Sequence, residues 1–297
     1  MTLIADHEPT PAAASRRGFP LAWLGVVPFL AFTTLFLIVP VAHIVVQAFQ
    51  TPDGRWSLDT MLSLAEPQIA SSYWLSIRLS FVSALMGTVA GLALGYALYL
   101  GGLPNWVRRA FLTFSGVASN FAGVPLAFAF IATLGRLGLV TLLLRDLVGI
   151  NIYGLGFSLF SFWGLAVTYL YFQLPLMLLM IAPALEGLRP EWREAAQSLG
   201  ATDRQFMRQV TLPVLAPSVI GCFLLLFANA FGTLATVYAL TSARFPVVPI
   251  VLFQQIRGNV LYNPNLGYAL ALGMILIMAL SNSLYFILRR RAERWRK

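Results

Sequence analysis

Charge is scarce in this chain. Only 10% of its 297 residues are charged, whereas 59% are hydrophobic, and the mean hydropathy is +0.78. Soluble domains carry about 25% charged residues, so this chain has too few to cover a water-facing surface. The composition excludes a disordered chain, a secreted disulfide scaffold and a cytosolic enzyme. It predicts an integral membrane protein with little structure outside the membrane.

Residue types that often carry catalysis or bind metals are also scarce. Cys222 is the single cysteine, so no disulfide can form within the chain. The two histidines, His7 and His43, are separated by an apolar run and suggest no metal site. No Gly-x-x-x-x-Gly-Lys-Ser/Thr motif occurs, so ATP cannot bind through a P-loop. We therefore expect no catalytic residue, no metal and no cofactor.

Acidic residues are missing from every long apolar segment. Proton-coupled carriers usually place Asp, Glu or His inside their helices as relays. A transport protein that has neither a relay nor an ATP site is expected to take its energy from a partner. A self-sufficient secondary carrier or channel is the alternative, with ions coupled through backbone carbonyls.

Long apolar segments are what the chain does have. A helix needs about 20 apolar residues to cross the bilayer core. The predicted fold is therefore all-α, a polytopic membrane protein with six transmembrane helices. We expect a polar tail over 1–20, a transmembrane domain over 21–288 and a basic tail over 289–297. The predicted spans are about 22–48, 73–100, 110–134, 157–183, 213–241 and 266–288.

The basic residues indicate the orientation. Pairs at Arg16-Arg17 and Arg108-Arg109, a group at 189–208 and the run at 289–297 all fall on one side of the predicted spans. The positive-inside rule places that side, and both termini, in the cytoplasm. Because the positive charges flank apolar spans, the net charge of +9 indicates membrane orientation and contact with lipid rather than nucleic-acid binding.

Small residues recur in the second span. Gly87, Gly91 and Gly95 are spaced four apart, which places them on one helix face. Such a ladder lets another helix approach closely, so it predicts tight helix packing.

The polar loop over 184–212, between the fourth and fifth spans, predicts two short helices. Pro190 suits the first turn of a helix, and Gly200 suits a left-handed C-cap. Thr202 and Gln205 have the spacing of a capping box that opens a second helix. Pro213 would mark the return to the fifth span.

This loop resembles a known family. Glu194-Ala195-Ala196, then Gly200, then Val210-Thr211-Leu212-Pro213 match the signature of the permease subunits of binding-protein-dependent ABC importers. The family has Ile at the position of Val210. Asp203 and Arg204 lie outside the motif and are included for their place in the second short helix. The residues assigned to coupling are Glu194, Ala195, Ala196, Gly200, Asp203, Arg204, Leu212 and Pro213.

The resemblance implies a type I permease of the bacterial inner membrane. In that family the loop is cytoplasmic and holds a coupling helix, which docks into a groove on the ATP-binding subunit. The implied partners are two ATP-binding subunits, a homologous or identical second permease subunit and an extracytoplasmic substrate-binding protein. Hydrolysis would take place on the partner, so this chain would not itself be an enzyme.

Polar residues inside the spans are candidates for the substrate pathway. Asn229, Thr233 and Thr236 would share one face of the fifth span, and Gln173 precedes a proline in the fourth. Hydrogen bonding between helices is the alternative role for these groups. Arg78, in the second span, would face the cavity or extend to the headgroups.

The segment 244–272 bears on the solute. It resembles the corresponding part of permeases of the polyamine, phosphonate, thiamine and iron group. Within that group the expected solute is a small polar compound such as a polyamine or an aminoalkylphosphonate.

Overall fold

The structure is a computed structural model that describes residues 22–51, 53–242, 244–257 and 264–294. These residues form helices and connecting turns, with one isolated β-bridge between Gln50 and Trp56. Six of the described helices are long and apolar enough to cross a membrane, which confirms the predicted fold class. The chain divides into two compact units, Met1–Val46 and Gln47–Lys297. The predicted tail 1–20 lies outside the described residues.

The N-terminal unit is built from one interrupted helix. It comprises α1 (Ala22–Thr33), a π-turn (Thr34–Ile38) and α2 (Val39–Ala48), which runs on into the second unit. The π-turn ends at Ile38, two residues before Pro40. Proline lacks an N–H and clashes with the carbonyl four residues earlier, so a wider turn lets the helix continue through it.

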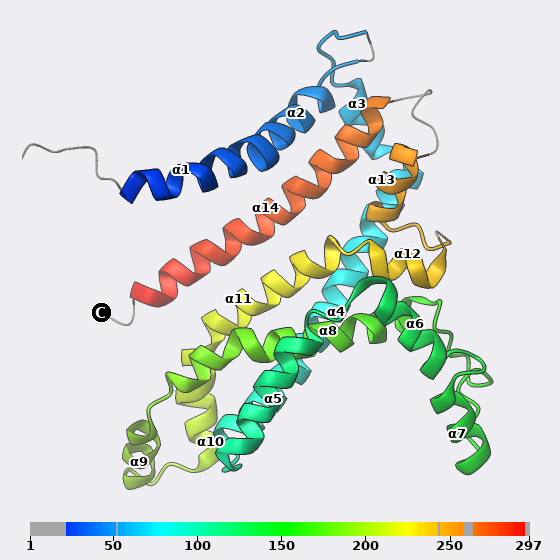
Figure 1. Ribbon diagram of the computed structural model, residues 1–297. Coiled ribbons are helices and arrows are strands. Elements are labelled where there is room, and N and C mark those ends of the chain that lie inside the picture. Colours follow the sequence, from blue (N-terminus) through cyan, green and yellow to red (C-terminus); the bar gives the residue numbers. More distant parts are fainter. Residues whose placement is uncertain (1–21, 52, 243, 258–263, 295–297) are drawn as a thin grey trace, which may run out of the picture. The chain divides into compact units, whose positions relative to one another are not determined.

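The second unit is organised around α4 (Pro67–Leu100) and α8 (Phe162–Glu186), which pack along each other (Figure 1). A Cβ atom on Gly87 would lie 2.8 Å from Cβ of Gln173, and one on Gly91 would lie 2.6 Å from Cβ of Met177. These helices can therefore approach this closely only where α4 carries glycine, which confirms the packing predicted from the ladder. A short helix, α3 (Asp59–Leu62), and a 3-10 turn (Ser63–Ala65) precede α4.

The third predicted span, 110–134, is not one helix. The structure has α5 (Asn105–Ala118), a break, α6 (Gly123–Leu134) and then α7 (Leu139–Leu147). Helix α5 ends at Ala118, Ala122 is extended and Gly123 has a positive φ of 73°, so the helical path is broken before α6 begins. Pro125 then prevents the normal hydrogen bond to the carbonyl of Phe121.

The fifth predicted span, 213–241, also has different limits. Helix α10 (Asp203–Phe206), a π-turn (Met207–Thr211) and α11 (Leu212–Phe231) form one continuous path, and α12 (Ala235–Thr241) is separate. The expectation that Pro213 marks the start of the span is wrong, because the π-turn before it lets the helix pass through the proline. Leu212 N–H donates to the carbonyl of Met207, five residues earlier.

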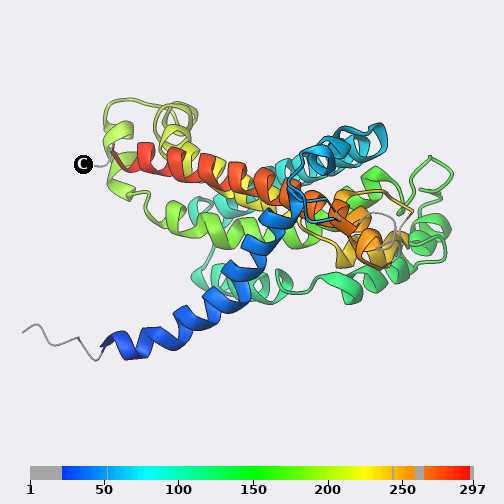
Figure 2. The same ribbon diagram turned by 90° about the horizontal axis from the view of Figure 1, so that it is seen from above.

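The last helices complete the second unit. After α13 (Val248–Arg257), α14 (Pro264–Arg294) lies beside α11 in both views (Figure 1, Figure 2). Helix α14 continues beyond the predicted span 266–288 into the basic tail. Between α4, α8 and α11 lies a buried apolar core, which includes Leu79, Tyr169, Phe172, Met177 and Leu226.

Candidate coupling loop and substrate pathway

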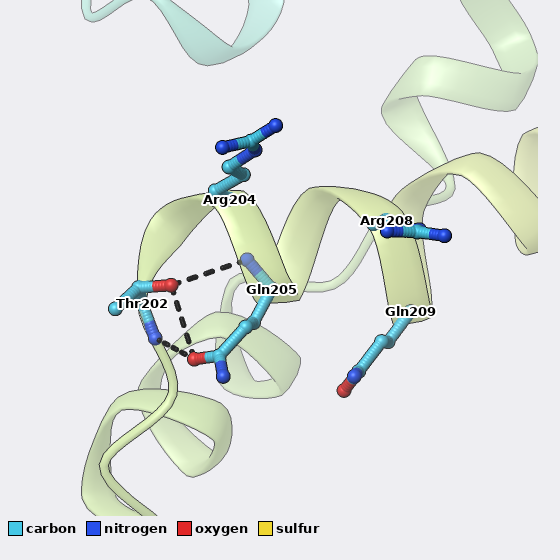
Figure 3. A pocket seen from close by; sticks show the side chains of 5 residues that line it. All are labelled: Thr202, Arg204, Gln205, Arg208 and Gln209. Carbon is cyan, nitrogen blue, oxygen red and sulfur yellow. Dashed lines mark hydrogen bonds between the residues drawn. The ribbon is translucent and has the colours of Figure 1, made fainter.

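The loop between α8 and α11 has the two predicted helical segments. Helix α9 (Pro190–Ser198) begins at its proline and is followed by Gly200, whose φ is +79°. This confirms the predicted left-handed C-cap. The capping box is also present (Figure 3): Gln205 N–H donates to Thr202 Oγ1 at 3.3 Å, and Thr202 N–H donates to Gln205 Oε1 at 2.8 Å.

An ion pair joins the two segments. Arg193 Nη2 on α9 lies 3.0 Å from Asp203 Oδ1 on α10. Asp203 is therefore engaged within the loop, a partnership that the sequence analysis missed. Its only sequence signal is the opposite charge of two residues on either side of a short turn.

Helix α9 presents an uncovered surface. Glu194 and Ala195 are exposed and Ala196 is half-buried. Leu199 is 88% exposed, although it is apolar. Trp192 on α9 is exposed as well, so this segment carries two uncovered apolar side chains among polar ones.

Arg204 follows the turn after α9 and belongs to α10. Together with Thr202, Gln205, Arg208 and Gln209 it lines an open pocket of about 450 Å³, which no carboxylate lines (Figure 3). Leu212 and Pro213 are exposed on α11 rather than on α9. The signature motif is therefore divided between the α9 segment and the continuous helix that follows it.

The candidate pathway residues of the fifth span do not share one helix face. Asn229 is exposed near the end of α11, and the helix ends at Phe231. Thr233, half-buried in the break, donates from Oγ1 to the carbonyl of Asn229 at 2.8 Å. Thr236 is fully buried, and its Oγ1 accepts a hydrogen bond from Gly123 N–H at 2.9 Å. The expectation of a common face is wrong because the helix breaks at Gly232.

The other two candidate pathway residues, Gln173 and Arg78, each contact a neighbouring side chain. Gln173 is fully buried, and its Nε2 donates to Ser83 Oγ on α4 at 3.1 Å. This is the hydrogen bond between helices that was the alternative role. Arg78 is exposed, and its guanidinium carbon lies 5.7 Å from the centre of the Phe162 ring.

Two helix breaks meet, which the sequence analysis did not foresee. Helix α6 begins at Gly123 and α12 begins at Ala235, and the Gly123–Thr236 hydrogen bond joins their first turns. Interrupted helices in transport proteins leave backbone groups unpaired where they line a cavity. Gly123 with Pro125, and Gly232, are the signals that could have predicted these breaks.

Six candidate spans and an exposed helical loop before the fifth define a membrane permease. The family model described as "Binding-protein-dependent transport system inner membrane component" matches residues 87–296. The chain belongs to this family, and it is therefore a multi-pass inner-membrane component of an import system that works with a binding protein.

Two curated relatives bear on the solute. The chain is 30% identical to the sulfate transport system permease protein CysT of Salmonella typhimurium, over 76% of this chain and 77% of the relative. It is 26% identical to the thiamine transport system permease protein ThiP of Escherichia coli, over 88% of this chain and 46% of the relative. The expected polyamine or aminoalkylphosphonate finds no support in these two similarities.

Two solved structures share the fold. A bacterial ABC transporter that imports the acidic polysaccharide alginate aligns with a TM-score of 0.68 at 18% identity, over 93% of this chain and 96% of that chain. The MetNI methionine ABC transporter aligns with a TM-score of 0.53 at 20% identity, over 77% of this chain and 99% of that chain.

Proposed function

We propose that this permease subunit forms the solute path of an ABC importer and docks through α9 onto a separate ATP-binding subunit. The observation that carries the proposal is the exposed α9, with Glu194 and Leu199 uncovered beside the left-handed Gly200. The complete transporter would contain two ATP-binding subunits, a second permease subunit and the binding protein. ATP hydrolysis would take place on the ATP-binding subunits, so this chain is a non-catalytic component.

The proposed solute is a small oxyanion of the sulfate class. The similarity to sulfate permeases supports this assignment. Helices α4 and α11 contain no acidic residue, so they offer no countercharge to a polyamine or another cationic solute. An anion requires no such countercharge in the spans.

Uptake measurements test both parts of the proposal. This chain is expressed together with its ATP-binding subunits, second permease subunit and binding protein in cells that lack sulfate uptake. It is expected to restore accumulation of radioactive sulfate but not of thiamine. Glu194→Lys is expected to abolish this uptake while the protein still inserts, because it reverses the charge on the docking helix. Thiamine uptake would contradict the assigned solute. Uptake that survives loss of the ATPase but collapses with the ion gradient would identify a secondary carrier.

The proposed orientation places both termini and α9 in the cytoplasm. In a Cys222→Ser background, a cysteine replacing Asp53 is expected to react with an impermeant thiol reagent from outside intact cells. A cysteine replacing Trp106, which is 71% exposed at the start of α5, is expected to react only after the cells are opened. The reverse pattern would overturn the orientation and the cytoplasmic position of α9.

Asn229 is proposed to line the solute path, and its substitution separates a transport role from a packing role. Asn229→Leu is expected to lower uptake severalfold at an unchanged melting temperature, because the exposed amide has no packing to lose. Thr236→Val is the matched contrast. It removes the acceptor of Gly123 N–H and is expected to cost about 1–3 kcal/mol of stability. If Asn229→Leu lowered uptake only in proportion to a lower melting temperature, Asn229 would not be part of the solute path.

A further inference from the structure

Three helix ends meet at one tyrosine beside the coupling loop. Tyr99 lies next to the last residue of α4, Arg108 lies in the first turns of α5, and Glu186 is the last residue of α8. The Tyr99 hydroxyl donates to Glu186 Oε1 at 3.2 Å. The guanidinium carbon of Arg108 lies 5.0 Å from the centre of the Tyr99 ring.

Tyr99 makes these two contacts with different parts of its side chain. The hydroxyl meets a carboxylate, and hydrogen bonds to charged groups are stronger than neutral ones. The ring face meets a cation, which its quadrupole attracts. Glu186 is exposed, whereas Tyr99 and Arg108 are half-buried. A single side chain therefore links α5 to α8 from the end of α4.

The cluster lies at the base of α9. Only Gly187, Leu188 and Arg189 separate Glu186 from Pro190, the first residue of α9. Helix α9 is connected to the spans at both ends: it packs on α10, which continues into α11, and this base joins it to α8. Helices α4 and α8, by contrast, are locked together along the glycine ladder. A force on α9 would reach the α4–α8 pair through the end of α8, where Tyr99 is bound.

We infer that Tyr99, Arg108 and Glu186 form a positioning cluster that passes movement of α9 to α4 and α5. The inference rests on the proposed docking role of α9 and adds the element through which that movement enters the spans. Without the cluster, α9 would still move with the ATP-binding subunit, but α4 and α5 would move less. Each ATP hydrolysed would therefore transport less solute. Tyr99 is a positioning residue here, because it acts through the helix ends rather than on the solute.

The test is the amount of sulfate imported per ATP hydrolysed by the complete transporter in proteoliposomes. Tyr99→Phe keeps the ring beneath Arg108 but loses the hydrogen bond, and it is expected to lower this ratio about three- to tenfold. ATP hydrolysis and the melting temperature are expected to stay close to those of the wild type. Glu186→Gln retains a side-chain acceptor and is expected to keep most of the ratio. Tyr96→Phe, at an exposed tyrosine on the same helix, is the matched control and is expected to be unchanged.

A double-variant cycle examines whether the two residues act together. If Tyr99 acts through Glu186, Tyr99→Phe combined with Glu186→Ala is expected to be no worse than Glu186→Ala alone. The inference would be overturned if the two substitutions lowered the ratio of sulfate imported to ATP hydrolysed additively, or if Tyr99→Phe left that ratio unchanged. It would also be overturned if transport and ATP hydrolysis both fell in proportion to unfolding of the protein. Glu194→Lys, measured in parallel, reports on α9 itself: if it hydrolyses ATP and transports normally, the proposed docking role is wrong. An impaired Glu194→Lys beside a normal Tyr99→Phe rejects only the cluster.

Discussion

Gly200→Val is expected to reduce uptake more than about tenfold while the spans remain folded. Gly200 has a φ of +79°, and no atom lies within 4 Å of the place where a Cβ would be. The substitution therefore meets no steric obstacle and acts through the backbone, where a left-handed conformation costs an L-residue about 1–2 kcal/mol. That cost falls on the turn that sets the direction of α9 relative to α10, so we expect the loop to rearrange and α9 to lose its docking geometry. Uptake and the amount of inserted protein, measured together, check the expectation.

Two variants control for the backbone effect. Gly200→Asn is expected to retain much of the uptake, because Asn tolerates the left-handed region better than valine does. Gly54→Val imposes the same strain in a different loop, since Gly54 has a φ of +77° and equally open surroundings. It is expected to leave uptake near that of the wild type. Equal uptake in the two valine variants would show that strain at Gly200 has no special consequence.

Gly91→Leu is expected to prevent accumulation of folded protein. Even the Cβ atom would lie 2.6 Å from both Cβ and Cγ of Met177 and 3.1 Å from the carbonyl oxygen of Leu174. Because one of these neighbours is backbone, α4 and α8 would have to separate. Gly91→Ala alone is expected to cost about 1–3 kcal/mol by overpacking. Thermal unfolding of the detergent-purified complex measures the loss.

Neighbouring glycines provide graded controls. At Gly95 the nearest atom to an added Cβ is the tip of the Leu185 side chain, at 2.8 Å. That tip can rotate away, so Gly95→Ala is expected to cost less than Gly91→Ala. Gly116 on α5 has no atom within 4 Å of a Cβ, so Gly116→Ala is expected to be neutral. An equal effect at all three positions would contradict the close α4–α8 packing.

The features that the sequence predicted correctly depend on local chemistry. The glycine ladder, the left-handed Gly200 and the Thr202–Gln205 capping box each arise from the conformational limits or hydrogen-bonding groups of a few nearby residues. Long apolar runs likewise indicated the six spans. The family signature was recognisable because its residues occupy fixed positions along one continuous stretch of sequence.

The features that it did not predict depend on residues that meet only in the folded chain. Apolar composition cannot reveal a break inside a span, so the separations of α5 from α6 and of α11 from α12 were missed. The burial of Thr236 follows from its contact with Gly123, which is distant in sequence. The Tyr99–Glu186 hydrogen bond likewise joins residues from different spans. Periodicity within one segment contains none of this information.

The π-turn at Met207–Thr211 fixes the rotation of α11 about its own axis relative to the coupling loop. A π-turn holds one residue more than an α-helical turn, and each residue rotates a helix by about 100°. Removing one residue there would restore the regular ladder but turn Asn229 about 100° away from its present direction. The number of residues between Gly200 and Pro213 therefore determines the rotation of α11 about its axis. That rotation determines the direction in which the Asn229 side chain points. Relatives that differ in this count by one residue would direct a different side chain into the same space.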